Sequence, residues 1–148
     1  ISFSNTEAVN VIDVFDTTPV LARVAMGDLF VRGTTGDDII QFGATITPNV
    51  ASTRVNSSVF NLGGTNKAVV FGRDGADTIQ QSSLAKTAEF YGGPGSDYLS
   101  GATAADYLVG GLGADRLLGN NGANELWWDD LGDTNLVAGG NDIINGEK

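Results

Sequence analysis

The chain has 148 residues, the size of one domain or of one part of a larger protein, and its 8 basic and 18 acidic side chains give a net charge of −10. This charge disfavours nucleic acid and anionic membrane surfaces as partners and favours cations. The chain has no cysteine and no histidine, which excludes disulfides, thiol chemistry and the commonest general base, and no apolar run is long enough for a membrane-spanning helix.

Residues 1–32 are predicted to form an irregular β segment or a cap. The stretch VNVIDVF at 9–15 alternates apolar and polar residues as a half-buried strand does, and DTTPV after it is typical of a turn. The first residue is Ile1, and we expect the chain to be a processed product or a fragment of a larger protein. Here and downstream, no window has the apolar stripe and caps of a helix, so we expect an all-β fold.

Residues 33–91 are predicted to form irregular rungs of a β-helix. Two similar stretches, GTTGDDIIQ at 33–41 and GRDGADTIQ at 72–80, contain glycines followed by an aspartate and a short apolar run. Runs rich in β-branched and aromatic residues lie near them, namely SSVFNL, KAVVF and AEFY. Gly72 follows Gly33 by 39 residues, a spacing for which we expect about two coils of a solenoid. Gly92 follows Gly72 by 20 residues, for which we expect about one coil.

Residues 92–148 are predicted to form a regular roll, because the chain divides into nine-residue units. These units read GGPGSDYLS, GATAADYLV, GGLGADRLL and GNNGANELW. After a one-residue insertion at Trp128, DDLGDTNLV follows, and AGGNDIIN closes the series one residue short, so Ile144 lies in phase with the eighth position. Internal repeats of this kind are the signature of a solenoid. The eighth position of each unit is apolar and is predicted to enter the core, at Leu99, Leu108, Leu117, Leu126, Leu136 and Ile144.

Each unit is interpreted as a tight turn followed by a very short strand. Glycines at positions one, two and four permit positive φ and a close approach of two backbones. Position eight then points inward, while positions seven and nine point to water, as at Tyr98, Arg116 and Glu125. Two units make one coil with a turn on each edge, so equivalent residues stack in ladders. We expect one ladder of Asp77, Asp97 and Asp115, and a second of Asp106, Asn124 and Asp142.

The stacked carboxylates predict a cation site. Bare carboxylates one coil apart repel each other, and a divalent cation between successive turns reverses this effect. Calcium fits best because it accepts many carboxylate and carbonyl oxygens in flexible geometry, whereas magnesium keeps its waters and zinc prefers nitrogen and sulfur. The candidate metal-binding residues are Gly92, Gly93, Gly95, Asp97, Gly101, Asp106, Gly110, Gly111, Gly113, Asp115, Asn124, Asp142 and Asp77.

GGPGSDYLS and GGLGADRLL resemble the G-G-x-G-x-D-x-U-x nonapeptide of the RTX, or haemolysin-type, calcium-binding repeat proteins. The resemblance implies a right-handed parallel β-roll with calcium in the turns, and Asp97, Asp115, Asp106 and Asp142 as ligands. Members of that family are typically secreted bacterial toxins, proteases, lipases and adhesins, in which the roll folds on meeting external calcium. The resemblance therefore implies a secreted, extracellular or cell-surface location.

The chain departs from the repeat at several positions. Ala104 stands where position four expects glycine and Asn124 where position six expects aspartate, so the second edge is expected to bind calcium more weakly. Asp38 and Asp77 have fewer repeat neighbours, and for them a plain turn role and a ligand role are both open.

The function expected from the sequence is a non-catalytic, calcium-stabilised extracellular module. Paired carboxylates can hydrolyse glycosides, but here they belong to a repeat that already accounts for them, and no catalytic residue is predicted. A carbohydrate- or surface-binding adhesin segment is the alternative, because Trp127 and Trp128 beside an acidic cluster could stack on sugars or cover a subunit contact. A subunit of an extracellular assembly is a further alternative, since an uncapped β-helix end offers unpaired strand edges.

Overall fold

The computed structural model describes residues 21–47, 50–55, 58–61, 66–81, 86–128, 134–137 and 143–146. In these ranges all regular structure is β-strand, which confirms the all-β expectation, and no helix there could cross a membrane. The strand VNVIDVF predicted at 9–15 lies outside the described residues.

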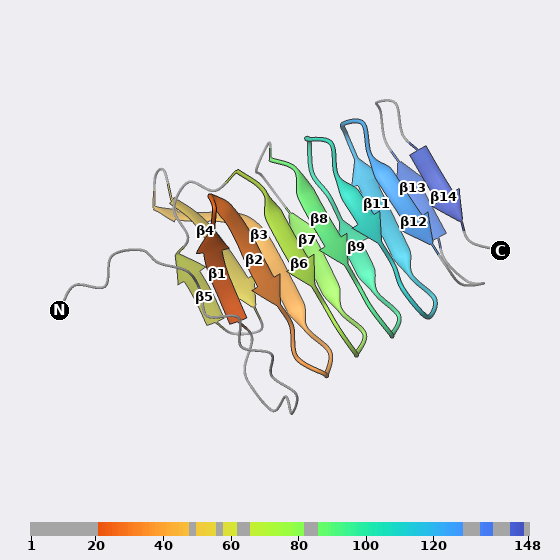
Figure 1. The fold of residues 1–148 in the computed structure, drawn as a ribbon, viewed down its shortest axis with the longest axis horizontal. Helices are drawn as coiled ribbons and strands as arrows, with labels where there is room; N and C mark the ends of the chain where they lie inside the picture. Colours follow the sequence, from red (N-terminus) through yellow and green to blue (C-terminus); the bar gives the residue numbers. More distant parts are fainter. Residues whose placement is uncertain are drawn as a thin grey trace.

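The strands form two seven-stranded sheets that stack as the two walls of a β-roll (Figure 1). The first sheet contains, in spatial order, β1 (Leu21–Ala25), β2 (Asp28–Arg32), β6 (Ala68–Phe71), β8 (Ala88–Tyr91), β10 (Tyr107–Val109), β12 (Glu125–Trp128) and β14 (Ile143–Gly146). The second contains β13 (Thr134–Val137), β11 (Arg116–Asn120), β9 (Tyr98–Ser100), β7 (Thr78–Gln81), β3 (Ile39–Thr47), β4 (Val50–Val55) and β5 (Ser58–Asn61).

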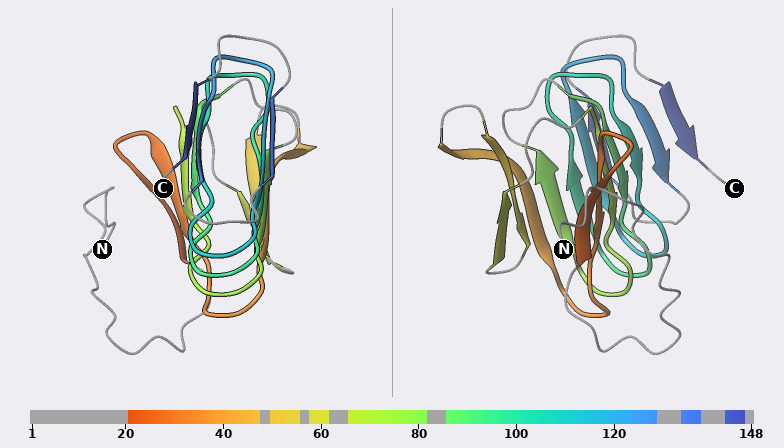
Figure 2. Two further views of the ribbon diagram at one scale, coloured as in Figure 1. Left: turned by 90° about the vertical axis from the view of Figure 1, so that its right-hand side faces the viewer. Right: turned by 60° about the vertical axis from the view of Figure 1, so that its left-hand side comes forward.

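From β6 onward the chain alternates between the two sheets, so one strand from each sheet makes one coil (Figure 2). Neighbouring strands within each sheet are parallel, with Leu117 opposite Leu99 and Leu126 opposite Leu108. Residues two units apart are therefore stacked in register. This confirms the prediction of a parallel β-roll with two nonapeptide units in each coil.

The 39-residue spacing between Gly33 and Gly72 corresponds to one coil, and the expectation of two coils is wrong. β2 pairs in parallel with β6, and β3 pairs in parallel with β7, so the two glycine turns lie in adjacent coils. The additional residues belong to an antiparallel meander of β3, β4 and β5 at the edge of the second sheet. Antiparallel partners can follow one another within one sheet, so the meander lengthens the coil without adding a rung.

The N-terminal edge of the first sheet is an antiparallel hairpin of β1 and β2. Its turn consists of Met26 and Gly27, with φ of 52° and 83°. Positive φ at both central residues is typical of the two-residue type I′ hairpin turn, whose twist matches that of the flanking strands. The hairpin thus ends the parallel stack of the first sheet with an antiparallel strand.

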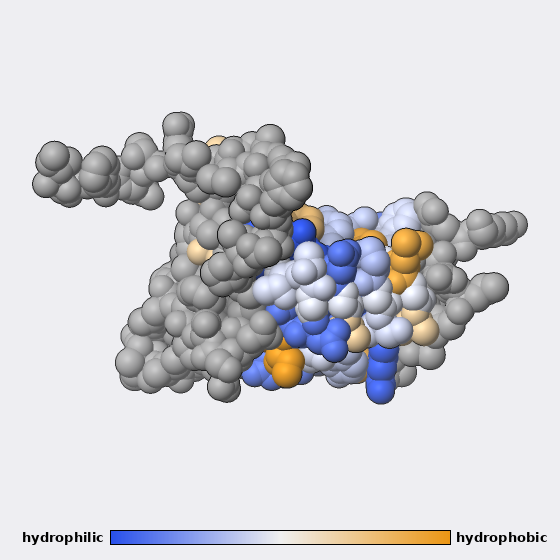
Figure 3. All heavy atoms as spheres, turned by 90° about the horizontal axis from the view of Figure 1, so that it is seen from below, coloured by the Kyte–Doolittle hydropathy of each residue, from blue (hydrophilic) through white to orange (hydrophobic). Residues whose placement is uncertain are grey.

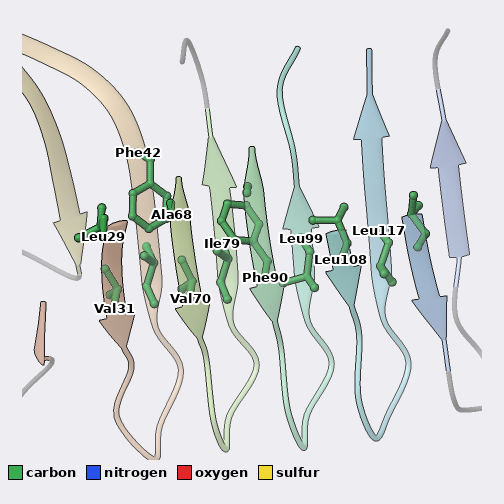
Figure 4. Packing of buried hydrophobic residues seen from close by; sticks show 13 residues of the cluster. Leu29, Val31, Phe42, Ala68, Val70, Ile79, Phe90, Leu99, Leu108 and Leu117 are labelled. Atoms are coloured by element: carbon green, nitrogen blue, oxygen red, sulfur yellow. The ribbon is translucent and has the colours of Figure 1, made fainter. Parts of the chain in front are cut away.

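The core lies between the two sheets and is built from inward-pointing apolar side chains (Figure 4). It contains Leu29, Val31, Ile40, Phe42, Ala68, Val70, Ile79, Ala88, Phe90, Leu99, Leu108, Leu117 and Leu126. The last four are fully buried, which confirms for the first four nonapeptide units that the eighth position enters the core. The side chains of Leu136 and Ile144 lie outside the described part.

The core is thicker in the earlier coils than in the nonapeptide coils. β8 contributes Ala88 and Phe90, and Phe90 stacks on Phe42 with ring centroids 5.7 Å apart. β9 and β10 each contribute one leucine, Leu99 and Leu108. A buried leucine stabilises by only about 1.5–3 kcal/mol, whereas ordering each residue costs about 1–2 kcal/mol. The nonapeptide coils therefore need a further source of stability.

Candidate metal centre

The turns stack along two edges of the roll, as Figure 2 shows. The described turns of the first edge are 33–38, 72–77, 92–97 and 110–115, which lead from the first sheet to the second. The second edge contains turns 101–106 and 119–124, which lead back to the first sheet. Seen from the side of the first edge, the described surface is mostly hydrophilic or neutral, with isolated hydrophobic residues (Figure 3).

The first edge holds a ladder of buried aspartates. The backbone N–H of Asp38 donates to Oδ1 of Asp77 at 2.8 Å, and that of Asp77 donates to Oδ1 of Asp97 at 2.7 Å. The N–H of Asp97 continues the series by donating to Oδ1 of Asp115 at 2.7 Å. One oxygen of each of these carboxylates thus accepts a hydrogen bond from the coil before it. Backbone N–H groups therefore join the ladder, which is not the bare stack of carboxylates expected from the sequence.

The second edge holds a parallel ladder with different chemistry. Oδ1 of Asp106 accepts from the backbone N–H of Ala88 at 2.8 Å, and Oδ1 of Asn124 accepts from that of Asp106 at 3.0 Å. The structure therefore places the described candidate residues in the two groups that the repeat phase predicts. Asp142 lies outside the described residues, and the metal-ligand role of the whole set stays a prediction.

Two oxygen atoms on the first edge are buried without a hydrogen-bond partner. Asp77 and Asp97 are only 1% and 2% exposed, and Oδ2 of each accepts no hydrogen bond. A buried polar group left unsatisfied costs about 1–3 kcal/mol, and more when it is charged. Burial raises the pKa of Asp77 to about 7 and that of Asp97 to about 6. A cation at these oxygens would remove the cost and keep the carboxylates ionised.

Glycine at position one makes room for these oxygens. A Cβ atom on Gly92 would overlap Oδ2 of Asp97 in the same turn, and one on Gly110 would overlap Oδ2 of Asp115. Gly101 has the same relation to Asp106 on the second edge. The first position of the unit is therefore glycine because the carboxylate folds back over it.

Glycine at positions two and four lets successive turns lie directly on each other. Gly113 has φ of 129°, and a Cβ atom there would overlap the carbonyl oxygen of Gly95 in the coil before. Gly111 has the same relation to Gly93. The backbones of successive turns are thus in direct contact, as expected from the glycines at these two positions.

The donor set on the first edge consists of oxygen alone. Nowhere in the described residues do three or more His, Cys, Asp or Glu side chains gather as a metal cluster. A cation there would depend on carboxylates from successive coils and on main-chain carbonyls. Calcium tolerates such a set in flexible geometry, whereas zinc requires nitrogen or sulfur donors, so the residues present fit calcium.

The comparison with protein families agrees with this chemistry. The family model of the RTX calcium-binding nonapeptide repeat, in four copies, matches residues 91–126. Residues 91–126 are RTX calcium-binding nonapeptide repeats. This RTX segment contains turns 92–97 and 110–115 of the first edge and both described turns of the second. No curated protein and no solved structure gives a significant match to the chain.

The aspartate ladder continues beyond the RTX segment. Turns 33–38 and 72–77 precede the match, yet Asp38 and Asp77 occupy the same ladder as Asp97. The candidate residues named from the sequence omit Asp38. Asp38 is the sixth residue of GTTGDDIIQ, the position that aspartate occupies in the repeat. Because the spacing from Gly33 to Gly72 was interpreted as two coils, direct contact between Asp38 and Asp77 was not expected.

The outer faces of the strands carry no comparable site in the described part of the chain. As expected from the sequence, Arg116 is exposed, and its guanidinium lies 5.7 Å from the ring centroid of Tyr98. Trp127 donates its indole N–H to Oε1 of Glu125 at 2.9 Å. The side chain of Trp128 and the acidic cluster that follows it lie outside the described residues.

Proposed function

We propose that this chain is a non-catalytic calcium-binding module whose β-roll is completed by calcium ions along the first edge. The observation that carries the proposal is the pair of buried Oδ2 atoms of Asp77 and Asp97, which accept no hydrogen bond. The match of residues 91–126 to RTX repeats supports calcium as the ion.

The proposed ligands are the first-edge carboxylates and the carbonyl oxygens of the glycine turns. Asp77, Asp97 and Asp115 supply negative charge through their ionised carboxylates. Hydrogen bonds to the turn backbone arrange these three side chains along one line. The turns supply neutral oxygens at Gly92, Gly93, Gly95, Gly110, Gly111 and Gly113. Calcium accepts about six to eight oxygens of this mixed kind, whereas magnesium demands a tighter octahedron and gives up its waters reluctantly.

We further propose that the module works outside the cell, as part of a larger secreted or cell-surface protein. A site that depends on calcium is filled where calcium is abundant and empty where it is scarce. On this view residues 92–148 are the calcium-dependent part of the chain, residues 33–91 form rungs that need the ion less, and residues 1–32 form a cap. The thin core of the nonapeptide coils supports this division.

Carbohydrate binding, as in an adhesin segment, has less support. Phe71 and Tyr91 stack on each other on the outer face of the first sheet, with ring centroids 5.0 Å apart, and Tyr107 lies 5.9 Å beyond. Rings that cover each other's faces leave little flat surface for a sugar ring. A role as a subunit of an extracellular assembly is supported only by the general argument that an uncapped end of a roll offers strand edges for pairing.

Thermal unfolding of the full chain tests the proposed function. Calcium should raise the midpoint above that in chelator by several degrees, since each site at ten times its Kd adds about 1.4 kcal/mol. Magnesium at the same concentration should raise it much less. Equal midpoints in calcium and in chelator, with no metal carried through purification, would contradict the proposal.

A further inference from the structure

The described turns differ in whether the second terminal atom of the side chain at position six forms a hydrogen bond. In turns 72–77 and 92–97 the residue at position two has a positive φ, 85° at Arg73 and 114° at Gly93. This conformation directs its N–H to the next coil, where Arg73 donates to the carbonyl of Gly92 at 2.9 Å, and Gly93 to that of Gly110 at 2.9 Å. The N–H at position two is then not available to donate to the aspartate of its own turn. Oδ2 of Asp77 and Oδ2 of Asp97 accordingly accept no hydrogen bond.

Turn 101–106 on the second edge has the opposite arrangement. None of its residues has a positive φ, and the N–H of Ala102 at position two donates to Oδ2 of Asp106 at 2.9 Å. Because Oδ1 of Asp106 accepts from Ala88, both oxygens of this carboxylate are hydrogen-bonded within the protein. Alanine at both position two and position four favours this arrangement, because alanine resists positive φ. The open turn 72–77 also lacks glycine at position two, where Arg73 nevertheless has positive φ, but it keeps glycine at position four, with φ of 118° at Gly75.

Turn 119–124 reaches the same result with side-chain amides. Oδ1 of Asn124 accepts from the N–H of Asp106, and its Nδ2 donates to the carbonyl of Asn120 at 3.2 Å. Nδ2 of Asn120 in turn donates to the carbonyl of Gly101 at 2.8 Å. At position six of this turn, a donating amide nitrogen therefore stands where an aspartate would present an oxygen atom to a cation.

The first turn of the first edge is closed in the same way. The N–H of Thr34 at position two donates to Oδ2 of Asp38 at 2.6 Å, and the Thr34 hydroxyl lies 3.2 Å from the same oxygen. No positive φ occurs in turn 33–38. Open turns therefore form a limited set, which includes those of Asp77 and Asp97.

We propose that this roll takes calcium along one edge only: the first edge binds the ion from Asp77 onward, and the second edge, at turns 101–106 and 119–124, is closed by the protein's own N–H donors. The inference rests on the proposed function and departs from the expectation that Asp106 and Asn124 are calcium ligands. The closed edge holds neighbouring coils in register without the ion, so calcium orders one side of a roll that is already joined on the other.

Calcium stoichiometry of the full chain, measured by equilibrium dialysis with radioactive calcium, tests the proposal. Asp97→Asn should bind at least one ion fewer than wild type, because the amide removes an open carboxylate. Asp106→Asn makes the same change at the matched position of the second edge and should bind as many ions as wild type. A loss in Asp106→Asn equal to that in Asp97→Asn would overturn the proposal.

A gain-of-site variant keeps the test decisive even where Asp106→Asn does not fold. Replacing Ala102 and Ala104 by glycine together with Asn124→Asp restores the turn conformation and the carboxylate, and should add at least one calcium ion. An unchanged stoichiometry in this folded variant would also overturn the proposal. If the wild-type chain binds no calcium, the proposed function is wrong and this inference is wrong with it. If the wild-type chain binds calcium and Asp97→Asn and Asp106→Asn lose equal numbers of ions, only this inference is wrong.

Discussion

Asp97 and Asn124 occupy the same position of their units and both accept an N–H from the coil before them, but they differ at one terminal atom. Oδ2 of Asp97 accepts no hydrogen bond, whereas Nδ2 of Asn124 donates to a turn carbonyl. A buried acceptor without a donor destabilises the fold until a cation arrives, while an amide in the same place satisfies the turn at once. Under the proposed function, single atoms at position six thus decide whether a turn depends on calcium.

Asp97→Asn should therefore change stability with opposite signs in chelator and in calcium. In chelator the variant should be more stable than wild type by about 1 kcal/mol, because it removes a buried unsatisfied carboxylate oxygen. In saturating calcium it should be less stable, because a site is lost. Urea denaturation in both conditions measures this, with Asp74→Asn as the control, since Asp74 is exposed in the same edge and carries the same charge. A loss of equal size in both conditions would contradict the open-oxygen interpretation.

The pH dependence of the calcium effect follows from the same two carboxylates. Burial raises the pKa of Asp77 to about 7 and that of Asp97 to about 6, from an ordinary value of 3.8. Without calcium the folded state binds these protons more tightly than the unfolded chain does, so their contribution to stability grows as pH falls through this range towards the ordinary value. Calcium requires the ionised form, so the rise in midpoint caused by calcium should be larger at about pH 8 than at about pH 5. A calcium effect independent of pH would argue against carboxylate ligands at these positions.

At the scale of the element, one nonapeptide unit is a glycine turn and a very short strand, and the turn conformation determines what the unit can bind. Position four shows this most clearly. Gly113 has φ of 129° and lies against the carbonyl of Gly95, whereas Gly36 occupies the same position in the first turn without positive φ, and a Cβ atom there would meet only the Thr34 hydroxyl, at 4.0 Å. Glycine at position four is thus required by close backbone contact at Gly113 but not at Gly36.

Alanine substitution at these two glycines should separate the two cases. Gly113→Ala should lower the free energy of unfolding by about 1–3 kcal/mol from backbone strain alone, and the overlap with Gly95 adds to it. Gly36→Ala should change it by less than about 0.5 kcal/mol, as other surface substitutions do. Chemical denaturation in calcium measures both, and equal losses would show that the stacked backbone contact at Gly113 has little energetic weight.

The repeat phase was sufficient to predict the short strands, the inward leucines and the two ladders from sequence. Each of these follows from a nine-residue period that is visible in the letters themselves. The meander of β3, β4 and β5 was not predictable in the same way, because the residues between Gly33 and Gly72 suit either another coil or an antiparallel excursion. The closure of Asp106 was also hidden, since the position of Ala104 suggests a weaker site but does not show that the N–H of Ala102 turns inward.

For the whole molecule, stability is unevenly distributed along the roll. β3, β6 and β8 each place two apolar side chains in the core, with Phe42 and Phe90 among them, whereas β9 and β10 each place a single leucine there. Glycine-rich turns lose more backbone entropy on ordering, and the thin coils bury less apolar surface to offset it. Under the proposed function, the ion is therefore expected to have the greatest effect where the core is smallest.

Hydrogen exchange along the chain should show this gradient. In chelator, protection should fall first in β9, β10 and β11, and later in β6 and β8, because the earlier coils bury more apolar surface. In calcium the difference should narrow. Mass-spectrometric exchange of the full chain measures it, and protection that falls uniformly in all coils would mean that the roll unfolds as one cooperative unit.

The most direct measurement of the central claim is a crystal structure of the full chain grown in calcium, with the ions located by their anomalous scattering. The account predicts calcium between turns 72–77 and 92–97 and between 92–97 and 110–115, in contact with Oδ2 of Asp97, and none between turns 101–106 and 119–124. A fully ordered first edge without calcium would contradict the proposed function, and calcium on the second edge as well as the first would contradict the one-edged roll.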